Sequence, residues 1–231
     1  MLIIPPNAFG DAVTNMAIDA ALLGTLPPDT ALLRHYAWTE PSATFGYTQA
    51  YAAVAALCPP GVRLCRRPTG GGFVDHRNDW TYALVVGRAV PAVDLPAPKI
   101  YSLVHAALRD ALADSGVAAR LAPCPEACGG PSTRCFDRPA GDDVVDPLGT
   151  KLAGAAMRRT REGLLLQGSL ARECLPDSLD FEGLKARFAG VVAASLELRP
   201  GEPDDLRPLF NAEKIAEASE RFGDENWLKK R

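Results

Sequence analysis

The sequence lacks an apolar run long enough to cross a membrane, and it lacks an excess of positive charge. A transmembrane helix needs roughly 20 consecutive apolar residues, and no stretch of the 231 residues reaches that length. The net charge of −3 gives no global basis for nucleic-acid binding. The first residues, MLIIPPN, have neither the basic start nor the apolar core of an export signal, so we expect a cytoplasmic protein with no membrane partner.

The sequence also lacks the usual spacing of a metal site. Its six cysteines are scattered through a chain that is large enough to build a full core, which favours reduced thiols over a disulfide framework. Cys124, Cys128 and Cys135 follow a C-x3-C-x6-C pattern with no histidine nearby, and this is not a typical zinc arrangement. We therefore expect no bound metal.

Three consecutive glycines form the most unusual stretch, RRPTGGGFVDH at 66–76. Glycine permits positive φ and lets the backbone approach a ligand closely. With two guanidinium groups beside them, the glycines indicate a site for a carboxylate, a phosphate or an acyl carbonyl. The alternative is a glycine-rich turn with solvated arginines. The candidate binding residues are Arg66, Arg67, Thr69, Gly70, Gly71, Gly72 and His76, the last of which could face the same site.

A second stretch of small residues, GTKLAGAA at 149–156, places a lysine at the head of a predicted strand. Gly154 and Ala155 leave space beside Lys151, which could then reach a carbonyl or phosphate oxygen. The alternative is an exposed lysine that protects a sheet edge from aggregation. Cys135 lies in a long irregular loop before this strand. Near a cation its thiol would become a nucleophile, and otherwise it would be a small buried apolar residue.

Hydrophobic periodicity predicts strands interleaved with helices, which is typical of an α+β or mixed α/β domain. We expect helices at 15–23, 99–115 and 211–222, and strands at 32–36, 43–46, 62–66, 80–86, 143–147, 151–158 and 164–170. Strands 62–66 and 80–86 would form a hairpin around the glycines. Thr14 or Asn15 would cap the first helix, and Gly24 would end it.

Four polar groups have plain structural interpretations. Asp19 is expected to be partly exposed at a helix edge, and His105 to be solvated on the polar side of its helix. His35 is expected to be packed and hydrogen bonded within a strand. The basic turn RRTRE at 158–162 is equally well a solvated hairpin turn or a docking site for an acidic protein.

The chain resembles the lipoate–protein ligase and octanoyltransferase family, which shares the catalytic domain of biotin–protein ligases. The blocks that carry the resemblance follow one another along nearly the whole chain. They are NMAIDAALL (15–23), TFGYTQ (44–49), RRPTGGGFVDH (66–76) with NDWTYAL (78–84), KLAGAAMRR (151–159) with LLLQGSL (164–170), and FGDENW (222–227).

The resemblance implies a mixed α/β, biotin/lipoate protein ligase-like fold, here one domain over 1–231 without a C-terminal accessory domain. It implies that the glycine loop lines an acyl pocket and that Lys151 hydrogen bonds the acyl carbonyl or a phosphate. STRCFDRP (132–139) is similar to the loop that carries a nucleophilic cysteine in ligase-like octanoyltransferases, with Cys135 sixteen residues before Lys151.

Two chemistries are compatible with the resemblance. As a transferase, the chain would attach an octanoyl or lipoyl group to a lysine of a lipoyl domain or of the glycine-cleavage H protein, taking octanoate from acyl carrier protein without a cofactor. As a ligase, it would use free lipoate with ATP and Mg. Gly72 favours the ligases, because the transferases often have arginine there. A third interpretation is a non-catalytic acyl-binding protein or the catalytic half of a two-chain ligase.

Overall fold

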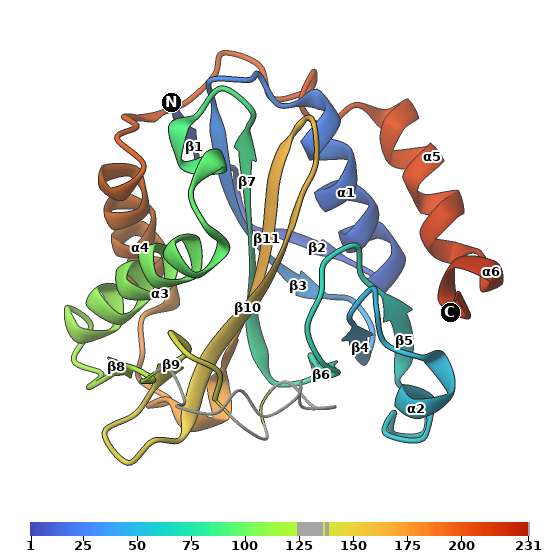
Figure 1. Cartoon of the computed structure of the whole chain (residues 1–231), viewed down its shortest axis with the longest axis horizontal. Helices are drawn as coiled ribbons and strands as arrows, with labels where there is room; N and C mark the ends of the chain where they lie inside the picture. The colour runs from blue at the N-terminus through green and yellow to red at the C-terminus, as the bar shows by residue number, and fades with distance from the viewer. Residues whose placement is uncertain (124–135, 137–138, 231) are drawn as a thin grey trace.

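The computed structural model describes residues 1–123, 136 and 139–230. Within these residues nine strands form a mixed sheet in the order β12-β1-β3-β7-β11-β10-β9-β8, with β2 beside β3 (Figure 1). The four long central strands are antiparallel neighbours: β3 (Ala31–Trp38), β7 (Asp79–Gly87), β11 (Gly163–Ala171) and β10 (Lys151–Arg159). Shorter strands complete the sheet: β1 (Leu2–Ile3), β2 (Ala8–Gly10), β8 (Arg120–Leu121), β9 (Val144–Val145) and β12 (Pro200–Gly201). The mixed α/β architecture predicted from the sequence is confirmed.

Helices cover both faces of this sheet (Figure 1). On one face, α3 (Ala97–Ala113) and α4 (Phe181–Ser195) pack on a cluster of buried strand residues. On the other face lie α1 (Ala12–Thr25) and α5 (Ala212–Gly223), with a second apolar cluster beneath them. The apolar spacing of α3 predicted this outcome, because residues three and four positions apart share one helix face. The short α6 (Glu225–Leu228) follows α5.

A small second sheet flanks the three consecutive glycines, which lie in the connection between two of its strands. It has the order β5-β4-β6, formed by β5 (Arg63–Arg66), β4 (Ser42–Phe45) and β6 (Val74–Asp75), and it packs with α2 (Tyr51–Ala55). The predicted hairpin between strands 62–66 and 80–86 is wrong, since β5 pairs in parallel with β4, whereas β7 belongs to the large sheet. The glycines therefore lie in the connection from β5 to β6 within the small sheet, and the candidate site lies between this sheet and the large one.

The predicted hairpin of residues 151–158 and 164–170 is confirmed as β10 and β11, which pair antiparallel. Short 3-10 turns, η1 (Pro91–Asp94) and η2 (Arg172–Cys174), lie between longer elements. No helix in the described part of the chain is long and apolar enough to span a membrane.

The first helix differs in detail from its prediction. Its N-cap is Asp11, whose side chain accepts a hydrogen bond from the Thr14 amide, so Thr14 and Asn15 lie inside the helix. Gly24 also lies inside the helix, which ends at Thr25 with Leu26 as its C-cap. An isolated glycine weakens a helix without ending it when packing supports the turn.

Candidate active site

A narrow pocket with a cavity volume of about 30 Å³ lies where the small sheet meets β10, β11 and α1. The small sheet contributes one wall, and the small residues of β10 and β11 contribute the facing one. Its lining residues are Met16, Tyr36, Thr44, Arg67, Val74, His76, Thr81, Gly154, Ala155, Ala156, Gln167, Gly168 and Ser169. Gly154 and Ala155, predicted from the sequence to leave space beside Lys151, line this pocket.

The polar side chains on one side of the pocket bind one another. Asp79 Oδ2 accepts hydrogen bonds from Ser169 Oγ at 2.6 Å and from Thr81 Oγ1 at 2.9 Å, and it lies 2.6 Å from His76 Nδ1. The other ring nitrogen of His76, Nε2, lies 2.8 Å from Thr44 Oγ1. His76 therefore lines the pocket as predicted, but both of its ring nitrogens are engaged within the protein.

A second buried network supports the opposite side. Asp19 forms an ion pair with Arg34 at 2.6 Å, and its Oδ2 accepts from Tyr36 Oη at 2.9 Å and from Gln167 Nε2 at 2.7 Å. Gln167 Oε1 in turn accepts from Thr69 Oγ1 at 2.7 Å. Burial raises the pKa of the Asp19 carboxyl, and the Arg34 guanidinium opposes that rise. The prediction of a partly exposed Asp19 is wrong, because its partners on β3 and β11 bury it completely.

These two networks leave mainly carbon atoms facing the pocket. A buried polar group that already has its hydrogen-bond partners needs none from a ligand. The pocket is therefore suited to a slender apolar chain. It offers little to a ligand that needs many hydrogen bonds along its length.

The glycine loop is held in shape by Arg67. This guanidinium donates from Nε and Nη2 to the Gly70 carbonyl at 3.0 and 2.6 Å, from Nη2 to the Gly72 carbonyl at 2.8 Å, and from Nη1 to Thr44 Oγ1 at 3.1 Å. Gly71 has φ of +83°, and a Cβ there would lie 2.7 Å from Arg67 Nη2. Glycine at Gly71 is thus required both by the backbone conformation and by the arginine.

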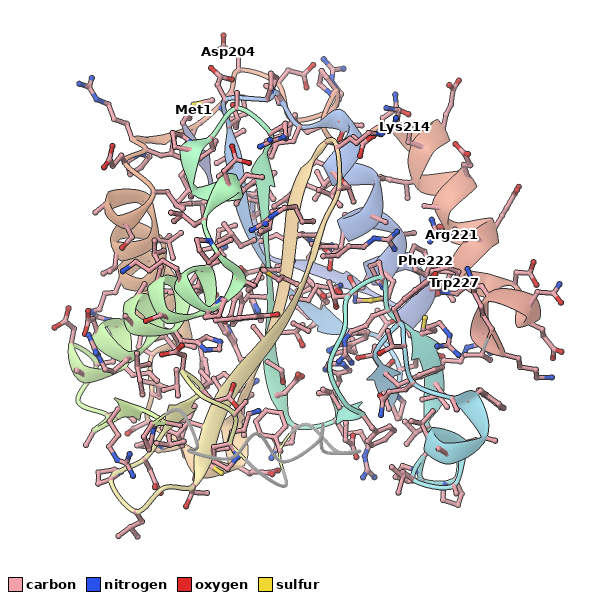
Figure 2. All side chains as sticks on the ribbon, in the orientation of Figure 1. Met1, Asp204, Lys214, Arg221, Phe222 and Trp227 are labelled. Carbon is pink, nitrogen blue, oxygen red and sulfur yellow. The ribbon has the colours of Figure 1, made fainter. Side chains whose placement is uncertain are left out.

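Arg66 lies outside the pocket lining. Its buried guanidinium donates to the main-chain carbonyls of Tyr47, Gln49, Trp227, Leu228 and Lys230 and stacks over the Phe45 ring. Trp227 and Phe222 lie together where α5 meets α6, next to the small sheet (Figure 2). The direct substrate contact predicted for Arg66 is therefore not what this geometry offers. Instead, the side chain fixes the C-terminal helix to the start of the glycine loop.

Lys151 begins β10 and is only 7% exposed. Its Nζ forms an ion pair with Asp143 Oδ2 at 2.6 Å and lies 5.4 Å from the centre of the Phe136 ring. A Cβ at Gly154 would lie 2.6 Å from both Cε and Nζ of Lys151, so the lysine folds over a residue that lines the pocket. The alternative of an exposed edge lysine is wrong, because β10 pairs with β9 on one side and β11 on the other.

Asp143 is a functional candidate that sequence reasoning missed as a partner of Lys151. The residue is 5% exposed, and its Oδ2 also accepts from the Ala140 amide at 2.6 Å. The available signal was the order of the predicted strands, since strand 143–147 directly precedes strand 151–158 and pairing between them brings an acid close to the lysine.

Cys135, Cys124 and Cys128 lie outside the described residues, so their predicted roles stay predictions. Among the described cysteines, burial raises the pKa of Cys65 to about 12 and also raises the pKa of Cys58 and Cys174. A thiol with a raised pKa is a weaker nucleophile at neutral pH because less thiolate is present. None of the three thiols in the described part of the chain is activated.

The histidines outside the pocket have different outcomes. His35 stacks on Trp80 at 4.7 Å, and its Nδ1 lies 2.7 Å from the Thr81 carbonyl, so the prediction of a packed histidine is confirmed. The prediction of a solvated His105 is wrong, since it is 1% exposed. The turns around β8 and β9 cover the side of α3 that the helical pattern left polar.

The basic turn lies at the far end of β10 from Lys151. Arg158 Cζ stacks 5.4 Å above the Tyr47 ring, and its Nη1 donates to the Pro68 carbonyl at 3.5 Å. Arg159 Nη2 donates to the Leu95 carbonyl at 2.5 Å, while Arg161 is exposed. Two of the three arginines therefore have contacts within the protein, and a docking role for the turn stays a prediction.

Comparison of the sequence with those of known proteins identifies relatives of this chain. The chain is 33% identical over 183 residues to the octanoyltransferase LipM of Kyrpidia tusciae, covering 74% of this chain but 65% of that protein. It is 32% identical over 226 residues to LipM of Symbiobacterium thermophilum, covering 86% of this chain and 79% of that one. The chain thus spans less than two thirds of the length of the first of these curated relatives.

Solved structures share the fold. A bipartite lipoate–protein ligase of Thermoplasma acidophilum, described with its E2 lipoyl domain, superposes with a TM-score of 0.71 at 18% identity, over 98% of this chain and 95% of that one. A lipoate–protein ligase A bound with ATP gives a TM-score of 0.73 at 17% identity, over 98% and 97% of the two chains. The family model described as the lipoyl protein ligase A/B catalytic domain matches residues 11–180. The chain therefore belongs to the lipoyl protein ligase A/B catalytic domain family.

Proposed function

We propose that this protein is an acyltransferase that attaches an octanoyl or lipoyl group to a lysine of a lipoyl domain. The observation that carries the proposal is the narrow apolar pocket whose wall, at Gly154, packs against the Lys151 ammonium. The carbon-lined interior suits the apolar character of an unbranched acyl chain, and the lysine lies where it can donate to a carbonyl oxygen. The relatives named octanoyltransferase LipM support this chemistry.

The proposed nucleophile is Cys135. Its thiolate attacks the carbonyl carbon of an octanoyl thioester, the new C–S bond forms, and the carrier leaves as a thiolate that takes up a proton. The neutral ε-amine of the acceptor lysine then attacks the acyl-enzyme. An amide forms, the bond to Cys135 breaks, and the amine proton returns the cysteine to a thiol. Thioester exchange is nearly isoenergetic and amide formation is downhill, so ATP is not needed.

Two observations support the role of Lys151. Its ammonium is buried beside the pocket, where a hydrogen bond to a developing oxyanion is worth more than in water. Phe136, the residue that follows Cys135 in the sequence, packs against the same ammonium group. We assign no base role to His76, because Asp79 and Thr44 engage both of its nitrogens.

The partners that this function requires are an acyl carrier protein and a lipoyl domain or the glycine-cleavage H protein. A reduced cysteine suits the cytoplasmic location predicted from the cysteine pattern. The lipoyl domain reported with the T. acidophilum ligase supports an acceptor of this class, since that protein shares the fold.

A second candidate function is ATP-dependent lipoate ligation. The run Gly70-Gly71-Gly72 favours it, as does the similar fold of a ligase bound with ATP. In that case the glycine loop and Lys151 would contact the acyl-adenylate, and ATP with Mg would supply the activation that the thioester supplies in the transferase.

Acyl transfer from two sources separates the candidates. The purified protein is mixed with a lipoyl domain and either octanoyl-acyl carrier protein without ATP, or free lipoate with ATP and Mg. The proposal predicts acceptor modification only in the first mixture. Modification only in the second, with release of AMP, would establish the ligase. Tight octanoate binding without turnover in either mixture would instead indicate a non-catalytic acyl-binding protein.

A further inference from the structure

His105 is a buried histidine with a defined hydrogen-bond partner. It lies in α3, is 1% exposed, and places Nδ1 2.7 Å from the main-chain carbonyl oxygen of Asp142. Because a carbonyl oxygen only accepts, Nδ1 carries the proton. Burial lowers the pKa of His105 and so favours the neutral ring, in which Nε2 is a lone-pair acceptor. Nε2 has no partner in the part of the chain that the structure describes.

The carbonyl that His105 holds belongs to a strained residue. Asp142 has φ of +66°, a left-handed conformation that is uncommon for residues with a side chain, although aspartate adopts it more often than most. It persists only if its surroundings hold it. The described contacts that do so include the bond from His105, the bond from the Asp142 amide to the Ala122 carbonyl at 3.0 Å, and the bond from the Asp143 amide to the Ala140 carbonyl at 3.1 Å.

The orientation of the Asp142 peptide determines where the side chain of Asp143 points. Asp143 follows it directly, and its Oδ2 accepts both the Ala140 amide and the Lys151 ammonium at 2.6 Å. If the Asp142 peptide relaxed, the Asp143 carboxylate would rotate with it, and Lys151 would lose an ion-pair partner that helps to hold it over Gly154. The hydrogen bond from His105 is thus linked to Lys151 through the Asp142–Asp143 peptide unit and the Asp143 carboxylate.

We propose that His105 is a positioning residue for Lys151, acting through the Asp142 carbonyl and the Asp143 carboxylate. The proposal rests on the proposed function only for the catalytic role of the lysine. The geometric part, that His105 fixes where the ammonium lies, stands independently of which reaction the site performs.

Two amide variants separate positioning from mere packing. In His105→Asn the side-chain NH2 occupies the place of Nδ1–H, whereas in His105→Gln it occupies the place of Nε2. We expect kcat of the asparagine variant to stay within about threefold of wild type, and kcat of the glutamine variant to fall about tenfold with KM for the acyl thioester nearly unchanged. Equal kcat values in the two variants would overturn the proposal.

A readout that needs no turnover tests the geometry alone. An amine-directed reagent labels Lys151 at a rate that peptide mass spectrometry can follow. The glutamine variant should label faster than wild type and the asparagine variant at the wild-type rate. If the wild type proves not to be an acyltransferase, this measurement still decides whether His105 positions the lysine, and identical rates in all three proteins would refute it.

The wild-type protein alone provides a test that no folding defect can obscure. Imidazole ¹⁵N chemical shifts distinguish the two neutral tautomers of His105. We expect the Nδ1-protonated form at neutral pH. The Nε2-protonated form would contradict the proposal, because Nδ1 could then not donate to the Asp142 carbonyl.

Discussion

Gly154 lacks a side chain at the point where Lys151 needs the space. A Cβ there would lie 2.6 Å from the Lys151 ammonium and 2.9 Å from Asp143 Oδ1, both well inside van der Waals contact. The flexible lysine can move away, whereas Asp143 is tied to the Ala140 amide. The glycine therefore permits a particular position of the lysine, and the backbone at Gly154 does not itself require positive φ.

At this residue we expect Gly154→Ala to leave the fold intact and to reduce kcat by about tenfold or more, because the methyl group displaces Lys151 from the pocket wall. Steady-state transfer with thermal unfolding as the fold control measures both effects. Gly190→Ala in α4 is the matched control, since a Cβ there meets nothing within 4 Å. It should keep full activity. An active Gly154→Ala protein would refute the assigned position of Lys151.

His105 predicts a pH dependence of stability at the residue scale. Burial and the nearby Lys151 lower its pKa, while Asp143 and Asp142 oppose the change. The unfolded chain therefore takes up the proton first as pH falls, so stability is full above the ordinary histidine value of about 6.5 and is lost as pH drops through it. Urea unfolding at pH 7.5 and 5.5 should show a larger loss for wild type than for His105→Asn. His35, whose pKa burial also lowers, is common to both proteins. Equal losses would show that His105 does not titrate this way.

At the scale of elements, the position of the C-terminal α6 depends on the side chain of Arg66, which ends β5 of the small sheet. Arg66 is 0% exposed, and five main-chain carbonyls accept its hydrogen bonds. Trp227 Nε1 in turn donates a hydrogen bond to the Arg66 carbonyl at 2.9 Å. Carbonyls near a helix C-terminus have no partner within the helix, and a guanidinium satisfies several at once.

We expect Arg66→Ala to lower the free energy of unfolding by on the order of 3 kcal/mol, because buried carbonyls lose charged donors. Local proteolysis within α6, mapped by mass spectrometry, should accelerate more than cleavage elsewhere. Arg63→Ala, at the exposed start of the same strand, is the control and should behave like wild type. If both alanine variants unfold alike, α6 is held by its apolar contacts alone.

The sequence predicts well those elements whose contacts are local. The periodic apolar positions of α3 and the paired pattern of β10 and β11 are both confirmed, since each is decided by neighbours within one helix or one hairpin. The glycine loop was found because three glycines have few other uses. The parallel pairing of β5 with β4 was missed, because a strand does not reveal a distant partner in its own composition.

The burial of charged groups was the weakest part of the sequence-based prediction. Asp19 and Asp143 look like surface acids in isolation, and only the fold supplies their partners Arg34 and Lys151. His105 lies on a face of α3 that would be solvated if the turns around β8 and β9 did not cover it. Helical periodicity identifies the face that packs on the sheet, and a second covering layer leaves no such pattern.

For the whole molecule, the account combines a carbon-lined pocket, a buried lysine at its wall and a cysteine as the group that carries the acyl chain. The pocket and the lysine are features of the fold. The cysteine is the link that distinguishes a transferase from a ligase, because a ligase activates its acid with ATP and needs no covalent acyl-enzyme.

The most direct measurement of that link is intact mass spectrometry after incubation with octanoyl-acyl carrier protein in the absence of ATP. The account predicts one added octanoyl group, mapped to the peptide of Cys135. Adding a lipoyl domain should remove this group and octanoylate the acceptor lysine. Cys174→Ser, at an exposed cysteine, should behave like wild type. A Cys135→Ala protein that octanoylates the acceptor at the wild-type rate would contradict the account.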